Sequence, residues 1–114
     1  MAIIYHNPRC GTSRKVLEAL QEKGHQVEVV EYLKQPLSRE ALAKLISEAG
    51  LSVRDAVRSK EALFTELGLD DPAISDEALL DAMKTHPILM NRPFVVTEKG
   101  TRLCRPAEVV NEIL

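Results

Sequence analysis

The sequence of 114 residues contains no tryptophan and only two phenylalanines and two tyrosines. So few aromatic rings argue against a platform on which the bases of single-stranded nucleic acid stack. Positive charge is not in excess either, because the formal net charge is −2, whereas a general nucleic-acid-binding domain is normally basic. We therefore expect no nucleic acid among its partners.

Cysteines, long apolar runs and clustered metal ligands are also scarce. The chain has two cysteines, no apolar run long enough to span a membrane and no signal-like N-terminus, which together predict a protein of the reducing cytoplasm without a membrane partner. The histidines, His6, His25 and His86, are scattered, and no Cys/His cluster has the spacing of zinc ligands. We therefore expect neither a metal nor another bound cofactor.

What the sequence does contain is typical of one soluble globular domain spanning residues 1–114, with 45% hydrophobic and 28% charged residues. The apolar pattern predicts a strand over residues 2–5, a helix over residues 12–23 and a second strand from Val27 to about Tyr32. A strand, a helix and a strand within about thirty residues form a βαβ unit, whose two strands are parallel.

A helical block follows at about residues 38–86, with Ser38 and Ser75 as candidate N-caps. Beyond it, residues 94–103 have the pattern of a β-hairpin, and Pro106 suits the first position of a last helix. This order matches an α/β, thioredoxin-like fold with a mixed four-stranded sheet and a helical insertion. In that fold a proline, often cis, precedes the third strand, and Pro93 is the candidate.

The chain is organised around a polar segment, residues 5–14, between the first strand and the first helix. Cys10 is expected at or just before the start of this helix, where unpaired N–H groups and the helix dipole lower the pKa of a thiol and attract an oxyanion. The segment predicts attack by the Cys10 thiolate on a small oxyanion. The predicted anion cradle consists of Gly11, Thr12 and Ser13, and the two hydroxyls are also candidates to cap the helix.

Single residues exclude two neighbouring motifs. Ser13 takes the place of the second thiol of Cys-x-x-Cys, and Val16 takes the place of the arginine in a Cys-x5-Arg phosphate loop. A covalent product on Cys10 must therefore be resolved by Cys104 or by a thiol from outside. Cys104 is predicted to be a packed core residue, and the alternative for Cys10 is that it, too, is a small buried hydrophobe.

Several basic side chains are candidates to support this chemistry. Arg92 lies in the loop expected to face the cysteine, Arg105 ends the hairpin near the same edge, and Arg58 lies in the helical block, where only chain folding would bring it close. Converging guanidinium groups hold a dianion that would otherwise repel a thiolate. His6 would lower the pKa of Cys10 as an imidazolium or orient it by a hydrogen bond; alternatively, backbone groups satisfy its ring.

Three segments, residues 5–14, 86–93 and 100–106, are similar to the glutathione/glutaredoxin-coupled arsenate reductases, and the similarity extends over essentially the whole chain. On that resemblance Cys10 is the catalytic cysteine and His6 is the histidine near the thiol. The arginines that bind the arsenic oxyanion correspond to Arg58, Arg92 and Arg105.

The resemblance implies an oxidoreductase whose substrate is arsenate, whose co-substrate is glutathione and whose partner is glutaredoxin. The Cys10 thiolate would attack arsenate, glutathione and glutaredoxin would resolve the adduct, and arsenite would be released. Three alternatives remain. The first is a thiol oxidoreductase like a monothiol glutaredoxin, whose Cys-Gly-Phe-Ser loop resembles Cys-Gly-Thr-Ser, and the second is a non-enzymatic regulator of the Spx type that binds RNA polymerase. The third is a thioredoxin-like domain whose function has drifted. The downstream arginine motifs argue against the first, and the missing second thiol argues against the second.

Overall fold

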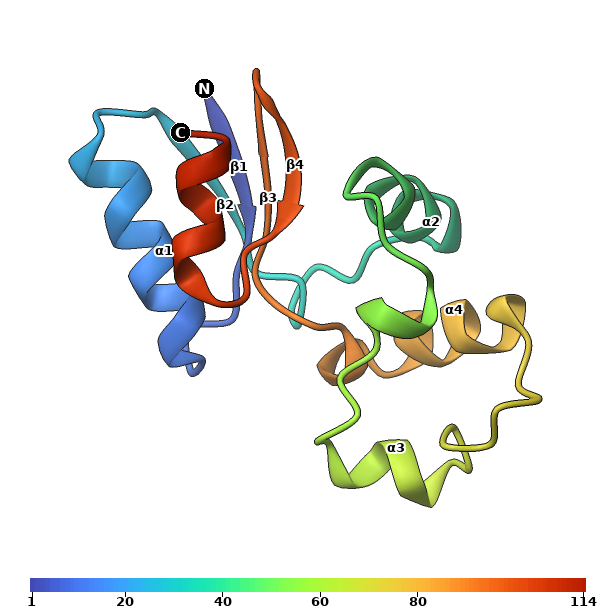
Figure 1. Ribbon diagram of the computed structural model, residues 1–114. Helices are drawn as coiled ribbons and strands as arrows, with labels where there is room; N and C mark the ends of the chain where they lie inside the picture. Colours follow the sequence, from blue (N-terminus) through green and yellow to red (C-terminus); the bar gives the residue numbers. More distant parts are fainter. The chain divides into compact units, whose positions relative to one another are not determined.

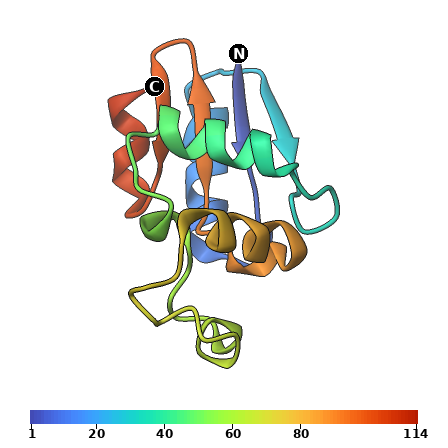
Figure 2. The same ribbon diagram turned by 90° about the vertical axis from the view of Figure 1, so that its right-hand side faces the viewer.

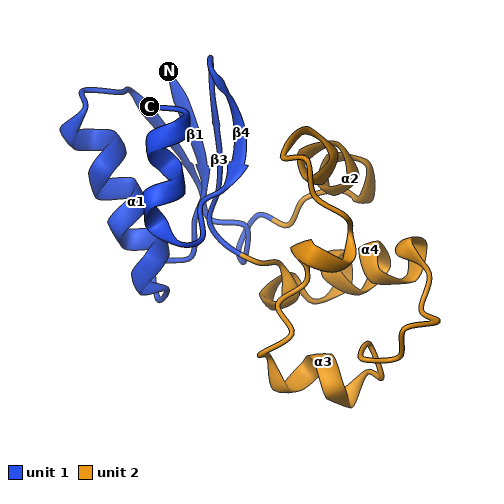
Figure 3. Cartoon of the chain, viewed as in Figure 1, with its two compact units in different colours: residues 1–35, 92–114 blue, residues 36–91 orange.

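The computed structural model describes all 114 residues, and the chain divides into two compact units (Figure 3). Unit 1 consists of residues 1–35 and 92–114, and unit 2 consists of residues 36–91. The predicted helical insertion, residues 38–86, lies within unit 2. Whether the two units act as the single domain expected from the length stays a prediction.

Unit 1 contains a sheet, one α-helix and one 3₁₀ helix (Figure 1). In chain order its elements are β1 (Ala2–Tyr5), α1 (Gly11–Glu22), β2 (Val27–Val30), β3 (Phe94–Thr97), β4 (Gly100–Leu103) and η3 (Ala107–Glu112). The sheet has the order β2-β1-β3-β4, in which β1 pairs parallel with β2 and antiparallel with β3, and β3 pairs antiparallel with β4. The predicted mixed four-stranded sheet and thioredoxin-like fold are confirmed.

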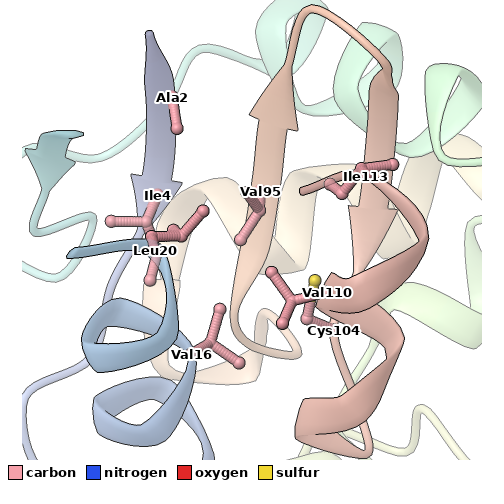
Figure 4. Close-up of a cluster of buried hydrophobic side chains, with 8 residues drawn as sticks. All are labelled: Ala2, Ile4, Val16, Leu20, Val95, Cys104, Val110 and Ile113. Carbon is pink, nitrogen blue, oxygen red and sulfur yellow. The ribbon is translucent and has the colours of Figure 1, made fainter. Parts of the chain in front are cut away.

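The core of unit 1 lies where α1 and η3 pack against the sheet (Figure 4). Apolar residues one helical turn apart on α1, Val16 and Leu20, are fully buried against strand residues that alternate along β1. The buried cluster comprises Ala2, Ile4, Val16, Leu20, Val95, Cys104, Val110 and Ile113. Burying each large aliphatic side chain contributes about 1.5–3 kcal/mol, so this cluster fixes α1, and with it the segment that precedes α1.

Two details of unit 1 differ from the sequence-based prediction. The last helix is a 3₁₀ helix that begins at Ala107, so Pro106 is its N-cap and does not occupy the first helical position. The Arg92–Pro93 peptide bond is cis, as the fold analogy predicted, but the Arg105–Pro106 bond is also cis, which the sequence did not indicate.

Unit 2 is helical (Figure 2). Its elements are α2 (Arg39–Glu48), η1 (Arg54–Ala56), α3 (Ala62–Glu66), α4 (Asp76–Thr85) and η2 (Pro87–Leu89). The two predicted N-caps are confirmed, since Ser38 Oγ accepts from Ala41 N at 3.1 Å and Ser75 Oγ accepts from Ala78 N at 3.2 Å. Helix α2 packs against α4. No helix in either unit is both long enough and apolar enough to cross a membrane.

Candidate active site

The candidate site lies at one edge of the sheet of unit 1. β1 and β2 are parallel, so both end at this edge; β3 begins opposite the end of β1, and β4 ends opposite the beginning of β3. The segments that follow β1 and β4 and the segment that precedes β3 therefore meet there. These segments carry Cys10, Arg105 and Arg92, which are far apart in the sequence.

Cys10 is the N-cap residue of α1, with extended backbone angles, as its predicted place at the helix start requires. Its backbone is held on both sides, because its N–H donates to Asn7 O at 3.0 Å and its carbonyl accepts from Arg14 N at 3.0 Å. The side chain is only 8% exposed, yet Cys10 is not part of the apolar cluster of unit 1. Cys10 is thus buried, as the alternative interpretation had it, but among polar groups.

Arg105 connects the sulfur to the segment before β3. Its Nη1 donates to Cys10 Sγ at 3.6 Å and to the carbonyl oxygen of Arg92 at 3.1 Å. A backbone hydrogen bond also links the two segments, since Cys104 N donates to Pro93 O at 2.8 Å. The guanidinium of Arg92 also hydrogen-bonds the Cys10 sulfur, and Arg92 is 8% exposed. Two of the three predicted arginines therefore surround the thiol.

These contacts determine the ionisation of Cys10. Burial alone would raise the pKa of the thiol, because it disfavours the charged thiolate. Hydrogen bonds from the backbone N–H of Ser13 and from the guanidinium groups of Arg105 and Arg92 outweigh burial and lower the pKa from the ordinary 9.0 to about 7. At pH 7 about half of the molecules then carry the thiolate, compared with about 1% for an ordinary thiol.

His6 acts on this arrangement through Ser13. The His6 side chain is buried, and its Nδ1 lies 2.6 Å from Ser13 Oγ, which also accepts from Asn7 N at 3.1 Å. Burial lowers the pKa of His6, an effect that Arg14 adds to and Glu31 opposes. The lowered pKa favours the neutral ring, and a side-chain hydroxyl, not a backbone group, is the partner of Nδ1. The effect of His6 on the pKa of Cys10 stays a prediction.

Within the predicted anion cradle, the side chain of Ser13 has a different partner from the one expected. The Ser13 hydroxyl does not cap the helix, because it is turned inward to His6, and the N-cap side chain of Cys10 makes no capping bond. The Ser13 N–H is directed at the sulfur. The N–H groups of Gly11 and Thr12, in the first turn of α1, are then the helix donors available to an anion. Their role in binding stays a prediction.

Two other residues considered from the sequence are Arg58 and Cys104. Arg58 belongs to unit 2, where its N–H donates to Leu89 O at 2.7 Å and its Nε lies 3.8 Å from Glu61 Oε2. Its role as an oxyanion ligand stays a prediction. Cys104 is fully buried in the apolar cluster, where burial raises the pKa of its thiol to about 12. The structure confirms that Cys104 is a packed core residue.

The site as a whole combines a nucleophile with a receptor for negative charge. A thiolate at neutral pH, two guanidinium groups and the positive end of a helix lie at one sheet edge. Guanidinium groups bind tetrahedral oxyanions through paired hydrogen bonds and offset the repulsion between two anions. No group of three or more His, Cys, Asp or Glu side chains is arranged to hold a metal ion. The arrangement fits attack of sulfur on a small oxyanion.

Comparison with known proteins agrees with this geometry. The family model described as ArsC family matches residues 5–113. The chain belongs to the ArsC family. It is 61% identical to the arsenate reductase of Rhizobium meliloti over 111 residues, which cover 97% of this chain and 79% of that protein. It is 51% identical over the same coverage to the arsenate reductase of Escherichia coli K12. The solved structure of an arsenate reductase from Vibrio cholerae superposes with a TM-score of 0.94 at 45% identity, covering 99% of this chain and 97% of that one.

The match to the ArsC family model covers residues 5–113, and every residue predicted for the site lies within this range. The structural similarity also extends over unit 2 as well as unit 1, since 99% of the chain is covered. The similarity to the ArsC family expected from three short motifs is therefore confirmed over nearly the whole chain.

Proposed function

We propose that this protein is an arsenate reductase in which Cys10 is the nucleophile. The observation that carries the proposal is the Cys10 thiol, whose pKa is about 7 and which receives hydrogen bonds from Arg92 and Arg105. Relatives named arsenate reductase at 51–61% identity support arsenate as the oxyanion. Arsenate is a tetrahedral oxyanion, the kind of group that guanidinium groups bind through paired hydrogen bonds.

In the first step the Cys10 thiolate attacks the arsenic of arsenate. A sulfur–arsenic bond forms, an arsenic–oxygen bond breaks, and the departing oxygen leaves as water after protonation. Arg92 and Arg105 neutralise substrate charge so that two anions can meet, and they stabilise the charge that grows on the remaining oxygens. Arg58 is the third arginine that we assign to this role. The arsenic is still pentavalent at this stage.

Two further thiols complete the reduction. Glutathione attacks the arsenic on Cys10, its sulfur bonds to arsenic, and a second oxygen leaves as water. A glutaredoxin thiolate then attacks the sulfur of the bound glutathione, forming a mixed disulfide, and the electron pair of the broken sulfur–arsenic bond reduces arsenic to the trivalent state. Water releases arsenite and restores the Cys10 thiol. An external thiol is needed because Cys104 is buried and protonated.

Glutathione is a co-substrate in this scheme, and glutaredoxin is a transient partner. Both work in a reducing compartment, so we assign the protein to the cytoplasm, where free cysteines such as its two persist. Phosphate resembles arsenate in shape and charge, and the site would admit both anions. Selectivity then comes from the chemical step, since sulfur attacks the larger and softer arsenic more readily.

The decisive experiment measures arsenite formed from arsenate by the purified protein with glutathione and glutaredoxin, beside Cys10→Ser and Cys104→Ser. We expect steady turnover in the wild type and in Cys104→Ser, and none in Cys10→Ser. Turnover that persists in Cys10→Ser would overturn the assignment of the nucleophile. A wild type that makes no arsenite but binds an iron–sulfur cluster, visible as brown colour, would instead indicate a monothiol glutaredoxin.

A further inference from the structure

A hollow of about 420 Å³ lies beside the segment that precedes Cys10 and takes no part in the oxyanion site described above. It lies entirely within unit 1, and its walls come from two loops. The lining residues are Asn7, Pro8 and Arg9 from the loop after β1, and Glu31, Leu33 and Lys34 from the turn after β2. Small-molecule sites in proteins typically measure about 300–1,000 Å³, so this hollow is of the size that admits a small peptide.

The position of the hollow follows from the topology. β1 and β2 are parallel neighbours, so the loops that follow them leave the sheet at the same edge. His6 N donates to Val30 O at 2.8 Å and prolongs the pairing into both loops. The first loop is held by Arg9 N, which donates to Asn7 Oδ1 at 3.0 Å. The turn after β2 is held by Lys34 N, which donates to Glu31 O at 2.9 Å.

Arg9 sets the distance between the hollow and the nucleophile. It is the residue directly before Cys10, and consecutive Cα atoms are about 3.8 Å apart. An extended tripeptide spans about 10 Å. A tripeptide whose two ends are held by the walls of the hollow therefore places its central thiol within a few residues' length of Cys10. Neither Arg92 nor Arg105 lines the hollow.

The charges around the hollow are those of a zwitterion receptor. Lys34 Nζ and Glu31 Oε1 lie 3.7 Å apart, with side chains 78% and 39% exposed. Such an exposed ion pair contributes little to stability, so a ligand that supplies both opposite charges replaces it at small cost. Arg9 adds a second cation on the facing loop, and Leu33 and Pro8 supply apolar surface between them.

We propose that this hollow binds the reducing tripeptide glutathione, with its terminal ammonium and carboxylate on Glu31 and Lys34 and its other carboxylate on Arg9. The inference rests on the proposed function, because it names the binding site of the co-substrate in that reaction. The sulfur of the bound glutathione attacks the arsenic on Cys10. One sulfur–arsenic bond forms, one arsenic–oxygen bond breaks, and the oxygen leaves as water. No electrons are transferred in this step.

The kinetic test compares charge-reversed variants at saturating arsenate and glutaredoxin. In Lys34→Glu and in Arg9→Glu we expect the KM for glutathione to rise about tenfold, a change that corresponds to about 1.4 kcal/mol, with the KM for arsenate unchanged. Lys99→Glu, an exposed site in the turn between β3 and β4, makes the same change in net charge and should behave as the wild type. With 2-mercaptoethanol, which has no carboxylate or ammonium, Lys34→Glu and the wild type should be equal.

A binding test separates the failure of this inference from the failure of the proposed function. S-methylglutathione, which cannot react, is titrated into isotopically labelled wild-type protein without arsenate, and amide shifts are recorded by NMR. We expect the changes to gather at residues 7–9 and 31–34 and to weaken in Lys34→Glu but not in Lys99→Glu. Shifts there in a protein that makes no arsenite would uphold the site and reject arsenate as the substrate.

Two outcomes would overturn the inference while leaving the arsenate reductase standing. The first is normal turnover with an unchanged KM for glutathione in both Lys34→Glu and Arg9→Glu. The second is a KM that rises for glutaredoxin and not for glutathione, which would show that the hollow receives the protein partner.

Discussion

The two cysteines of this chain are both buried, but their surroundings give them opposite chemistry. Cys10 is 8% exposed and Cys104 is 0% exposed, so accessibility scarcely separates them. The pKa of Cys10 is lowered to about 7, whereas the pKa of Cys104 is raised to about 12. Burial raises both pKa values, but at Cys10 the surrounding donors outweigh it, whereas at Cys104 burial prevails. The reactivity of a buried thiol therefore depends on whether donors offset its burial.

The architecture explains how one small sheet supports both environments. Cys104 follows β4 directly and is packed in the cluster that α1 and η3 form against the sheet (Figure 4). Its neighbour Arg105 is only partly buried and reaches the edge where β1 ends. A single step along the chain thus passes from the apolar core to the polar edge. The buried neighbour anchors the backbone from which the guanidinium extends to Cys10.

The largest expected effect is the contrast in alkylation rate between the two cysteines. At pH 7 we expect iodoacetamide to modify Cys10 at least about a thousand times faster than Cys104, because only Cys10 holds a substantial thiolate fraction. The Cys10 rate should rise from pH 6 to pH 8 and level off above that, since a lowered pKa means that the thiolate is lost only as the pH falls below about 7. Mass spectrometry of each cysteine-containing peptide measures both rates.

Denaturant supplies the internal control for that contrast. In guanidinium chloride both cysteines should react at similar rates, because unfolding removes the surroundings that distinguish them. Comparable labelling of Cys10 and Cys104 in the folded protein would contradict the opposite pKa shifts of the two thiols.

The next effect concerns Arg105, whose guanidinium hydrogen-bonds the Cys10 sulfur. Arg105→Gln removes the charge that hydrogen-bonds Cys10 Sγ at 3.6 Å, so the pKa of Cys10 should rise. A rise of one unit lowers the thiolate fraction at pH 7 about fivefold, and the alkylation rate should fall with it. Arg39→Gln, in an exposed ion pair with Asp81 in unit 2, is the matched control and should leave the rate unchanged. An unaltered pH profile in Arg105→Gln would remove this arginine from the site.

Much of the fold and of the surroundings of Cys10 was predictable from the sequence, but not all of it. Periodicity and turn residues predicted the four strands, and the place of Cys10 before a helix predicted its low pKa. The contact between Cys10 and Arg105 joins residues 95 positions apart, so spacing alone could nominate the arginine but not show that it reaches the sulfur. The expectation that Arg105 lies at the site came from the resemblance of short motifs to a known family and not from the spacing of residues.

The hydrogen bond between the Ser13 hydroxyl and His6 could not be predicted from the sequence. A serine in the first turn of a helix is equally compatible with capping, with solvent or with a buried partner. The choice depends on where the end of β1 places His6, which is set by packing across the whole sheet. The hollow beside Arg9 depends in the same way on two loops that meet only because β1 and β2 are parallel.

A smaller effect is expected from Ser13→Ala. The variant keeps the backbone N–H that bonds the sulfur, so the pKa of Cys10 should change by less than about half a unit. It leaves His6 Nδ1 and the buried Asn7 N–H without their hydroxyl partner, which costs about 1–3 kcal/mol of unfolding free energy. Urea unfolding and the alkylation profile separate the two effects. Ser47→Ala, on the exposed surface of α2, is the control and should alter neither measurement.

The smallest effect on Cys10 should come from changing its counterpart. Cys104→Ser places a hydroxyl in an apolar cluster and should lower the unfolding free energy by about 1–3 kcal/mol, while the alkylation profile of Cys10 and the turnover stay those of the wild type. Cys104→Ala, which buries no polar group, keeps the test valid if the serine variant folds poorly. Retained turnover in either variant would show that the resolving thiol comes from outside. Folded variants that stop after a single adduct on Cys10 would instead make Cys104 a participant, and the environment described for it would have to open during the reaction.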